Sequence, residues 1–542
     1  MTSSVSLKAL PDIRQQELTS GLSKRSGVPP GVQCEKTSWC DDAGLCTEVC
    51  ARGSVHVEPW LQNAIATQTE LSRRLPLCMA TLLGTHNSAI TIADGYGNRD
   101  EHFQQYFKWI RWVSSSSALR TNDQYFSLTD QLNLGVRAVE LDTHWVEGEL
   151  RIAHCGGFHA APFNVLVKAV NLVATLLGHP IHWDTETVGC DPSLSSISVL
   201  AQRSFADALA ELAAWLAQPQ NQDEFLLVFL DDQPDIKTWG FLPKLLIEIR
   251  QAFPAAMLYT PADHGTRNAS DWPSMGELVA AGKRVMVVSG VNYGADAAGV
   301  LFTKPDICNW QEPPLGDFKG QPQCIADQRP KFTKDPHTLT GTLFRVPSCE
   351  ILYGPLNCDF VLTGENWPVL DEQSLPLVTA CGLNMPSPDL LTPQRAAAAI
   401  WTWAPGQPQA ADGATSWLRR MLRRWQPLRM LLGLQESEQC AIMRAEDGRW
   451  RARPCTEDYP SACRTEGAEW VLGVGKSRGG CPGGASFALP AHAKDNAALQ
   501  RELQRSGQQA CWLPMQGPDW GLPGKAPAAK VPHGLSKIAR VQ

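Results

Sequence analysis

Gly84-Thr85-His86-Asn87-Ser88 ends an apolar, strand-like run, and so do two later strings, Val139-Glu140-Leu141-Asp142 and Ile152-Ala153-His154-Cys155-Gly156-Gly157. Together the three strings supply two histidines and three oxygen ligands within about seventy residues. This set of residue types suits metal-assisted cleavage of a phosphodiester by general acid–base chemistry.

Apolar runs alternate with helical stretches after Leu77. Such alternation predicts a parallel sheet, and polar residues at several strand ends favour a closed α/β barrel of the TIM type with its site at the carboxyl ends of the strands. Apolar periodicity predicts helices over Val199–Leu216 and Leu242–Phe253. The expected strands are Cys78–Gly84, Ala138–Asp142, Arg151–His154, Phe225–Leu230, Arg284–Ser289, Phe360–Thr363 and Ala398–Trp403.

Carboxylates are concentrated at these strand ends. Glu140 and Asp142 stand two apart on one strand and therefore face the same side. The Asn87 amide oxygen and the carboxylate of Asp231 or Asp232 complete a set of hard oxygen donors, which suits Ca²⁺ or Mg²⁺ and is poor for zinc. Strand alternation allows only one of Asp231 and Asp232 to face inward.

Two histidines flank this set of oxygen donors. His86 begins a polar turn after its strand, and His154 ends the next strand. Attack on a phosphodiester by a neighbouring hydroxyl needs a base for that hydroxyl and an acid for the leaving alkoxide, and two histidines supply both near neutral pH. A cation stabilises the charge that develops on the phosphoryl oxygens.

These residues resemble the X region of phosphoinositide-specific phospholipases C and the wider superfamily of phospholipase C-like phosphodiesterases. The matching strings are Thr85-His86-Asn87, Gly135-Val136-Arg137-Ala138-Val139-Glu140-Leu141-Asp142 and Ala153-His154, and the stretch 225–232 resembles the strand that supplies the fourth metal carboxylate. The resemblance implies His86 as general base and His154 as general acid. It also implies a calcium ion, with magnesium as the alternative, held by Asn87, Glu140, Asp142 and Asp231.

The chain resembles more narrowly the X-domain-only proteins of plants, algae and fungi, in which strings like Asn122-Asp123-Gln124-Tyr125 and Trp401-Thr402-Trp403 recur. It departs from the animal signalling enzymes, whose lysines near the strand resembling Arg284–Ser289 hold extra phosphates of the inositol ring. Only Lys283 and Arg284 stand at the start of that strand here, so we do not expect specificity for polyphosphorylated inositol. The resemblance implies a phosphatidylinositol-like or glycosyl-phosphatidylinositol-like lipid as substrate, at a membrane surface.

Charge and cysteine content limit the partners and the compartment. A net charge of −7 argues against nucleic acid as a partner. Of the 17 cysteines, only Cys46 and Cys50 approach the spacing of a zinc pair, so disulfides are expected, with at least one thiol left over. Disulfides imply a secreted, lumenal or cell-surface protein. Residues 1–30 hold no signal-peptide core, and we expect the true start to lie upstream.

Changes in composition and residue pattern along the sequence predict four regions. Residues 1–75 are a disordered leader and a cysteine-rich segment, 76–406 the catalytic barrel, 407–434 a linker, and 435–542 a small β-rich module with many cysteines and tryptophans. In the linker, Trp417–Trp425 has helical spacing, with arginines on one side and large apolar residues on the other. This stretch suits peripheral contact with an anionic membrane, and a linker helix packed on the barrel is the alternative.

Two other functions compete with the phospholipase C interpretation. A glycerophosphodiesterase or a phospholipase D-like enzyme would use a similar set of histidines and carboxylates. A lipid- or glycan-binding protein would use the barrel as a scaffold, because the cysteine pattern around Arg449-Trp450, Cys455 and Cys463 is loosely lectin-like. We also expect Trp401 and Trp403 to close the barrel, and Cys155 and Cys190 to pair.

Overall fold

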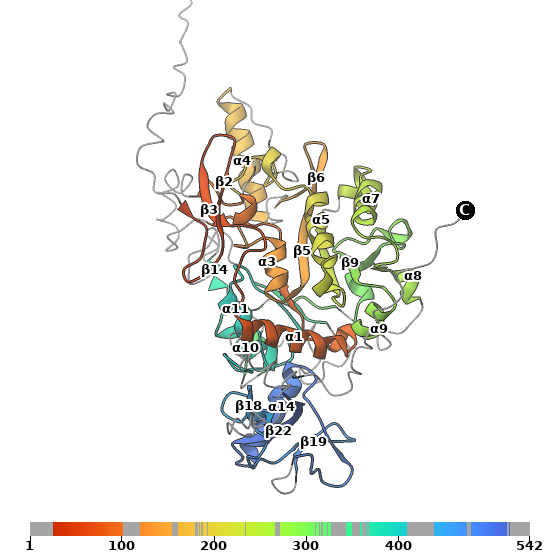
Figure 1. Ribbon diagram of the computed structural model, residues 1–542. Helices are drawn as coiled ribbons and strands as arrows, with labels where there is room; N and C mark the ends of the chain where they lie inside the picture. Colours follow the sequence, from red (N-terminus) through yellow and green to blue (C-terminus); the bar gives the residue numbers. More distant parts are fainter. Residues whose placement is uncertain are drawn as a thin grey trace, which may run out of the picture.

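The computed structural model describes most of the chain (Figure 1). The described residues are 25–100, 120–153, 161–178, 183, 185, 188–191, 193, 195–232, 235–265, 272–308, 310–313, 315, 318–321, 324–326, 343–348, 358–359, 366–367, 369–408, 438–473, 478–517 and 520. His154, Cys155 and the stretches 360–363 and 417–425 lie outside them.

A parallel sheet forms the centre of the molecule. Its strand order is β10-β9-β7-β5-β4, and the short strand β8 (Leu258–Tyr259) also pairs with β9. Nearly every residue of these strands is buried, as expected for a parallel sheet covered on both faces. The sequence therefore predicted the mixed α/β class and the parallel sheet correctly. The strands are β4 (Leu83–Thr85), β5 (Val136–Val146), β7 (Leu226–Asp232), β9 (Val285–Ser289) and β10 (Leu301–Thr303).

The strand expected over 151–154 differs from the prediction in direction. β6 (Glu149–Ile152) pairs antiparallel with the second half of β5, with Thr143 opposite Ile152. β5 runs eleven residues, so the hairpin extends past the sheet and β6 returns toward its carboxyl edge. At the end of β6, the Ala153 amide donates a hydrogen bond to the Asp142 carbonyl at 3.1 Å.

Two short strands were missed in the sequence. β13 (Arg345–Pro347) and β16 (Met385–Ser387) pair in parallel. β16 also lies beside β4, because the Leu82 amide donates to the Asn384 carbonyl at 2.7 Å and the His86 amide to the Pro388 carbonyl at 3.4 Å. The expected strand over 398–403 is wrong: Ala398 ends a helix, and Trp403 makes only an isolated bridge.

Helices pack on the outside of the sheet. α5 has an apolar face at the expected three- and four-residue spacing, and the Ser204 hydroxyl accepts a hydrogen bond from the Asp207 amide at its start. α7 likewise occupies the second predicted helix. The helices of this part are α1 (Pro59–Arg73), α3 (Leu128–Asn133), α4 (Ala161–Leu176), α5 (Phe205–Leu216), α6 (Asp235–Thr238), α7 (Leu242–Ala252), α8 (Pro261–His264), α9 (Met275–Ala280), α10 (Ser374–Ala380) and α11 (Pro393–Ala398).

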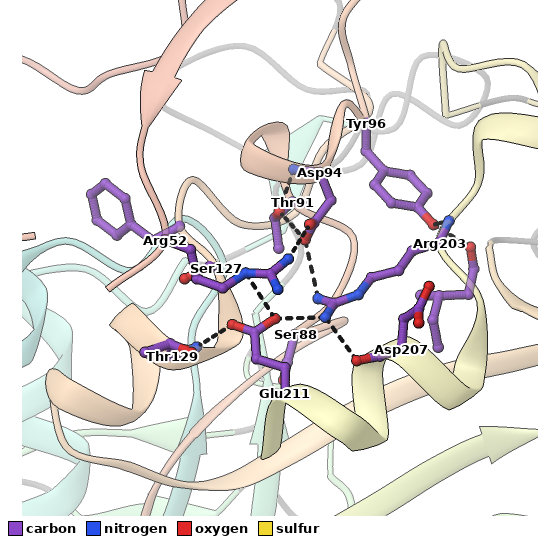
Figure 2. Close-up of polar contacts among 12 residues, drawn as sticks. Arg52, Ser88, Thr91, Asp94, Tyr96, Ser127, Thr129, Arg203, Asp207 and Glu211 are labelled. Carbon is purple, nitrogen blue, oxygen red and sulfur yellow. Dashed lines mark hydrogen bonds and ion pairs between the residues drawn. The ribbon is translucent and has the colours of Figure 1, made fainter. Parts of the chain in front are cut away.

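A buried polar network links α5 to the loop that follows β4 (Figure 2). The Arg203 guanidinium lies 2.6 Å from Glu211 and 3.3 Å from Asp94, and Arg52 of the N-terminal segment lies 3.4 Å from Glu211. The Tyr96 hydroxyl accepts from the Arg203 amide at 3.0 Å and donates to the carbonyl of the last residue of β6. The network therefore fixes both the loop after β4 and the end of β6.

Disulfides hold the N-terminal segment, as the sequence predicted. Its strands β1 (Arg25–Ser26), β2 (Lys36–Cys40) and β3 (Cys46–Cys50) form a small sheet closed by the pairs Cys34–Cys50 and Cys40–Cys46. Four further pairs among the described residues are Cys78–Cys308, Cys324–Cys381, Cys440–Cys455 and Cys463–Cys481. Six such bonds indicate an oxidising, extracellular or lumenal environment. Cys190 is also disulfide-bonded.

The C-terminal region is a small β-rich unit, as expected. It holds β17 (Gln439–Arg444), β18 (Trp450–Pro454), β19 (Ala462–Thr465), β20 (Trp470–Leu472), β21 (Ala485–Phe487), α14 (Ala493–Arg505) and β22 (Ala510–Gln516). β18-β17-β22 and β20-β19-β21 form two antiparallel sheets. The one free cysteine among the described residues is Cys511, which is buried.

This C-terminal unit is attached to the rest of the chain through Trp401-Thr402-Trp403. The Trp450 amide donates to the Thr402 carbonyl at 2.8 Å, and the rings of Trp401 and Trp403 both pack edge-on against the Trp450 ring. The two tryptophans therefore join the two parts of the molecule, and their expected role in closing the barrel stays a prediction.

The remaining regular elements are short. β11 (Phe318–Lys319) pairs with β12 (Ile325–Ala326), and β14 (Cys358–Asp359) with β15 (Asn366–Trp367). The 3-10 helices are η1 (Leu77–Met79), η2 (Ile92–Asp94), η5 (Val199–Ala201), η6 (Pro219–Asn221), η7 (Gly294–Asp296) and η8 (Lys304–Asp306). No helix within the described ranges combines the length and the apolarity that a membrane span requires.

Candidate active site

Polar side chains gather at the carboxyl ends of neighbouring strands. His86 and Asn87 follow β4, Glu140 and Asp142 lie within β5, and Asp231 lies near the end of β7. In the register of the sheet, Asp142 is directly opposite Asp231. This edge is where α/β folds with parallel strands place their functional groups, because the loops that follow the strands leave room for a ligand.

Three of the expected metal ligands form one acidic cluster. Glu140, Asp142 and Asp231 each offer a carboxylate oxygen, and these oxygens all lie within 4.8 Å of one another. Glu140 and Asp142 are buried, whereas Asp231 is exposed, so the cluster is open to solvent on the side of β7. The structure therefore brings together the three carboxylates that the sequence placed on two strands.

Asp232 points away from this cluster. The Ser289 hydroxyl lies 2.9 Å from both of its carboxylate oxygens and donates to this carboxylate, which also accepts a hydrogen bond of 3.1 Å from the Gly290 amide and one from the Tyr293 hydroxyl. Burial nevertheless raises its pKa to about 6. Of the two alternatives that the sequence left open, Asp231 is the residue that lies beside Glu140 and Asp142.

Glu140 is held by two donors. Its Oε2 accepts a hydrogen bond from the Asn87 amide at 2.9 Å and another from the Arg345 guanidinium. Burial raises the pKa of Glu140 to about 7, and the neighbouring charges of Asp142 and Asp231 act in the same direction, against the lowering effect of Arg345. Three carboxylates beside one guanidinium leave an excess of negative charge at this edge.

His86 forms a second group with two aspartates. Its Nδ1 lies 2.8 Å from Asp389 Oδ1, and Asp389 follows β16, the strand beside β4. His86, Asp123 and Asp389 have ligand atoms within 4.8 Å of one another. Burial opposes the charged imidazole, but the carboxylates of Asp389 and Glu140 outweigh it and raise the pKa of His86 well above 6.5. The hydrogen bond to Nδ1 fixes the ring and leaves Nε2 as the nitrogen available for proton transfer.

Asn87 connects the two groups. Its φ of 43° lies in the left-handed region, which turns the chain sharply after His86 and directs its amide toward Glu140. Its side-chain amide donates to Asp123 Oδ2 at 3.3 Å. Ser88 adds a third link, because its hydroxyl accepts from the Glu140 amide at 2.8 Å.

A chain of charges extends from Glu140 through the buried Arg345 to the half-buried Glu312 and Lys304. Arg345 contacts Glu312 Oε1 at 2.9 Å, and Lys304 contacts Glu312 Oε2 at 2.6 Å. Both cations also lie over the Phe229 ring, at 4.7 and 4.5 Å from its centroid. Arg345 and Lys304 lower the pKa of Glu312 to about 2, although its burial acts the other way. The Arg345 guanidinium is therefore fixed on two sides.

His154, the second expected histidine, lies outside the described residues, and its role stays a prediction. The last described residue before it is Ala153, whose amide is bonded to the Asp142 carbonyl. His144, two residues beyond Asp142, is buried in β5.

Three residues of the site were missed in the sequence. Asp123 lies in the string Asn122-Asp123-Gln124-Tyr125, to which the sequence analysis assigns no role in the site. An acidic residue within a polar turn is the sequence feature that could have indicated such a role. Asp389 and Arg345 follow or begin three-residue strands, β16 and β13. The stretch Met385-Pro386-Ser387-Pro388-Asp389 holds two prolines, and such a sequence gives no strand periodicity to detect.

The chain is distantly similar to several known proteins. No family model matches it. Two uncharacterized proteins from strains of Mycobacterium tuberculosis are 24% identical to it over 464 residues, which cover 83% of this chain and 78% of theirs. Among solved structures, one assigned as a glycerophosphoryl diester phosphodiesterase from Silicibacter pomeroyi shares 13% identity at a TM-score of 0.26, covering 61% of this chain and 97% of that one. A similarity at this TM-score establishes neither fold nor activity.

The donor set of the acidic cluster fits a hard divalent cation. Carboxylate oxygens are the ligands that Ca²⁺ and Mg²⁺ prefer, and a cation would balance the negative charge of the three neighbouring carboxylates. His86 belongs to the other group, with Asp123 and Asp389, so the ligands that the acidic cluster offers are oxygens. The cluster could hold a metal ion, and its composition does not distinguish calcium from magnesium.

Proposed function

We propose that the chain is a phosphoric diester hydrolase of the phospholipase C type. The observation that carries the proposal is the pairing of a His86–Asp389 dyad with the Glu140–Asp142–Asp231 cluster at one edge of a parallel sheet. A base that is fixed at Nδ1 and a carboxylate cluster suited to a cation are the groups that phosphodiester cleavage needs.

We also propose that the sheet continues into a closed barrel. β16 is hydrogen-bonded beside β4 and pairs with β13. At the other edge, residues after β10 approach β13, because the Arg345 amide donates to the Gln311 carbonyl at 3.0 Å. These contacts support a ring in which β13 and β16 bridge β10 and β4.

Asn87, Glu140, Asp142 and Asp231 are the proposed holders of the cation. When bound there, Ca²⁺ or Mg²⁺ would supply positive charge that stabilises the phosphoryl oxygens as negative charge develops on them. Arg345 stays paired to Glu140 and Glu312, which positions the Glu140 carboxylate toward the site.

His86 is the proposed general base. Its Nε2 would take the proton of the hydroxyl next to the phosphate on the substrate ring, while that oxygen forms a bond to phosphorus. The bond from phosphorus to the glycerol oxygen breaks, and the leaving alkoxide takes a proton from His154, the proposed general acid. The products are a cyclic phosphate and a diacylglycerol-type lipid. Asp389 supports the imidazolium that forms on His86.

The proposed substrate is a phosphatidylinositol-like or glycosyl-phosphatidylinositol-like lipid, without extra ring phosphates. Lys283 and Arg284 precede β9 and so lie at the opposite end of the strands from His86. Both are engaged there: Lys283 contacts Asp263 at 2.9 Å, and Arg284 donates to the Leu216 carbonyl at 3.0 Å. Neither residue is placed to bind a phosphate at the acidic cluster.

The test is phosphorus NMR of the products from phosphatidylinositol and from glycerophosphodiesters, with and without a chelator. A cyclic inositol phosphate that disappears with the chelator supports the proposal, and His86→Ala and His154→Ala should abolish its formation without unfolding the protein. A glycerophosphodiesterase or phospholipase D-like enzyme would release no cyclic product. Full activity of His86→Ala would refute the proposed mechanism. Lack of hydrolysis of every phosphodiester would favour a binding protein.

A further inference from the structure

The helix α4 presents a large apolar surface to solvent. Val165, Leu172, Val173, Leu176 and Leu177 are 66, 61, 53, 77 and 71% exposed, and Trp183 is 39% exposed. We call these six residues the α4 patch. They are the majority of the large apolar side chains that are exposed among the described residues. A cluster of this kind marks an interaction surface, because soluble proteins rarely leave such areas open to water.

The patch is one coherent face of the helix. Val167 and Ala174 are buried and seven residues apart, so they mark the side of α4 that packs on the protein. At about 100° per residue, Val165, Leu172 and Leu176 lie roughly opposite Val167. The exposed apolar residues are therefore not the margin of the buried face of α4. They form an outer one.

Trp183 is fixed beside this face. The Trp183 amide donates to Asn171 Oδ1 at 3.1 Å, and Asn171 Nδ2 donates to the Trp183 carbonyl at 2.7 Å. The two bonds attach the segment that holds Trp183 to the middle of α4. A tryptophan next to exposed leucines is typical of surfaces that enter the boundary between lipid headgroups and acyl chains.

The charge of α4 favours a lipid surface. The helix contains no aspartate or glutamate, and its one charged residue is Lys168, which is exposed. This composition contrasts with the net charge of −7 of the whole chain. An anionic bilayer would attract Lys168 and meet no carboxylate of the helix. At 16 residues α4 is too short to cross a bilayer, so it would lie in the membrane surface.

The position of α4 in the fold is also consistent with a contact to a lipid surface, because the helix lies on the side of the candidate site. It begins eight residues after Ala153, whose amide is bonded to Asp142 at the acidic cluster. In Figure 1, α4 projects at the end of the molecule where the β5–β6 hairpin lies, opposite the C-terminal unit. A surface that receives α4 would therefore face the carboxyl ends of the strands.

We infer that the α4 patch binds the surface of a lipid bilayer and brings the site to a substrate held there. The inference rests on the proposed function for the identity of that substrate, while binding itself needs only α4. The partner is the lipid surface rather than a second copy of the chain, because the patch combines an acid-free helix with Trp183 on the side of the candidate site.

The test is sedimentation of the full chain with vesicles of phosphatidylcholine, alone or mixed with phosphatidylinositol. The variant Leu172→Ser/Leu176→Ser should bind at least about tenfold more weakly, since two of the most exposed apolar side chains leave the contact. The control Ile247→Ser/Leu377→Ser removes apolar side chains that are 51 and 44% exposed on α7 and α10, and it should bind like the unaltered chain. Equal binding of both variants would overturn the inference.

Two further measurements separate the possible failures. If the unaltered chain sediments as a dimer and the α4 variant as a monomer that binds vesicles normally, the patch is a self-contact and the inference is overturned. Hydrolysis of a water-soluble glycerophosphoinositol should be the same in both variants, because the site is intact. Vesicle binding through α4 without any hydrolysis would refute the proposed function and support docking. Hydrolysis of lipid together with vesicle binding that does not depend on α4 would support the proposed function and overturn the inference about the α4 patch.

Discussion

The contact between His86 and Asp389 gives the sharpest prediction. Asp389→Asn keeps the size of the side chain and removes its charge, while Nδ1 of His86 still lies beside it. At an effective dielectric constant of about 20, two unit charges roughly 4 Å apart interact by about 4 kcal/mol. Asp389 is the strongest of the carboxylates that raise the pKa of His86 against the effect of burial, so we expect that pKa to fall in the variant, while the charges of Glu140 and Asp123 continue to favour the imidazolium.

The rate should fall further than this shift alone requires. An asparagine donates as well as accepts, so it allows the wrong tautomer of the imidazole, and comparable changes at histidine–aspartate pairs lower kcat by about 10,000-fold. The assay is kcat against pH with phosphatidylinositol as substrate. In the native protein the rate should rise as pH passes upward through the pKa of His86, because the proposed base must be unprotonated. In Asp389→Asn this acid limb should move to lower pH while kcat drops.

The matched control is Asp296→Asn, whose carboxylate is 70% exposed beside Lys237 and belongs neither to the acidic cluster nor to the His86–Asp123–Asp389 group. It should leave both kcat and the acid limb unchanged. Thermal unfolding of both variants checks that the fold survives. Native kcat and an unmoved acid limb in Asp389→Asn would refute the role of Asp389.

Three more predictions concern stability and metal binding. Burial disfavours a charged Glu211, but Arg203 outweighs it and lowers the pKa of Glu211, so its contribution is complete above its ordinary pKa and is lost as pH falls through the lowered value. Glu211→Gln should therefore lower the free energy of unfolding by about 3–5 kcal/mol at pH 7, measured by urea denaturation. The difference in this free energy between the variant and the native protein should shrink in acid, and a constant difference would contradict the prediction. Ca²⁺ at about 100 times its Kd should stabilise the native chain by about 2.7 kcal/mol, and Asp231→Asn should lose most of that rise in Tm, whereas an identical rise in the variant would exclude Asp231 as a ligand. Cys78→Ser should lower stability by about 2–5 kcal/mol, since the Cys78–Cys308 bond joins residues 230 apart, and an unchanged urea midpoint would argue that this bond contributes nothing.

Sequence reasoning reached the centre of the sheet and much of the site because both depend on continuous apolar strands. β5 and β7 are long and buried on both faces, so Glu140, Asp142 and the Asp231–Asp232 pair stand out as charges within or after apolar runs. The choice between Asp231 and Asp232 needed the actual twist and register of β7. In the folded chain, the Ser289 and Tyr293 hydroxyls donate hydrogen bonds to Asp232, and these partners come from a different strand and loop.

The short strands β13 and β16, the run 398–403 and the direction of β6 could not be predicted from the sequence, for physical reasons. β13 and β16 are three residues long, too short for a periodic pattern, yet they position Arg345 and Asp389. The run Ala398–Trp403 is apolar because it packs under the C-terminal unit through Trp450, which imitates the composition of a strand. The direction of β6 depends on a two-residue turn after Val146, and a strand's sequence alone does not record its direction.

The His86–Asp389 contact joins residues 303 positions apart in the chain. His86 therefore acquires its partner only after almost three-quarters of the sequence has been made and β16 has docked beside β4. Contacts of such long range form late, because the intervening chain must be ordered first. A molecule released early or folded only in part would hold the acidic cluster without an oriented base. Under the proposed function, competence for hydrolysis would therefore depend on completion of the fold, because the base is oriented only when β16 has docked.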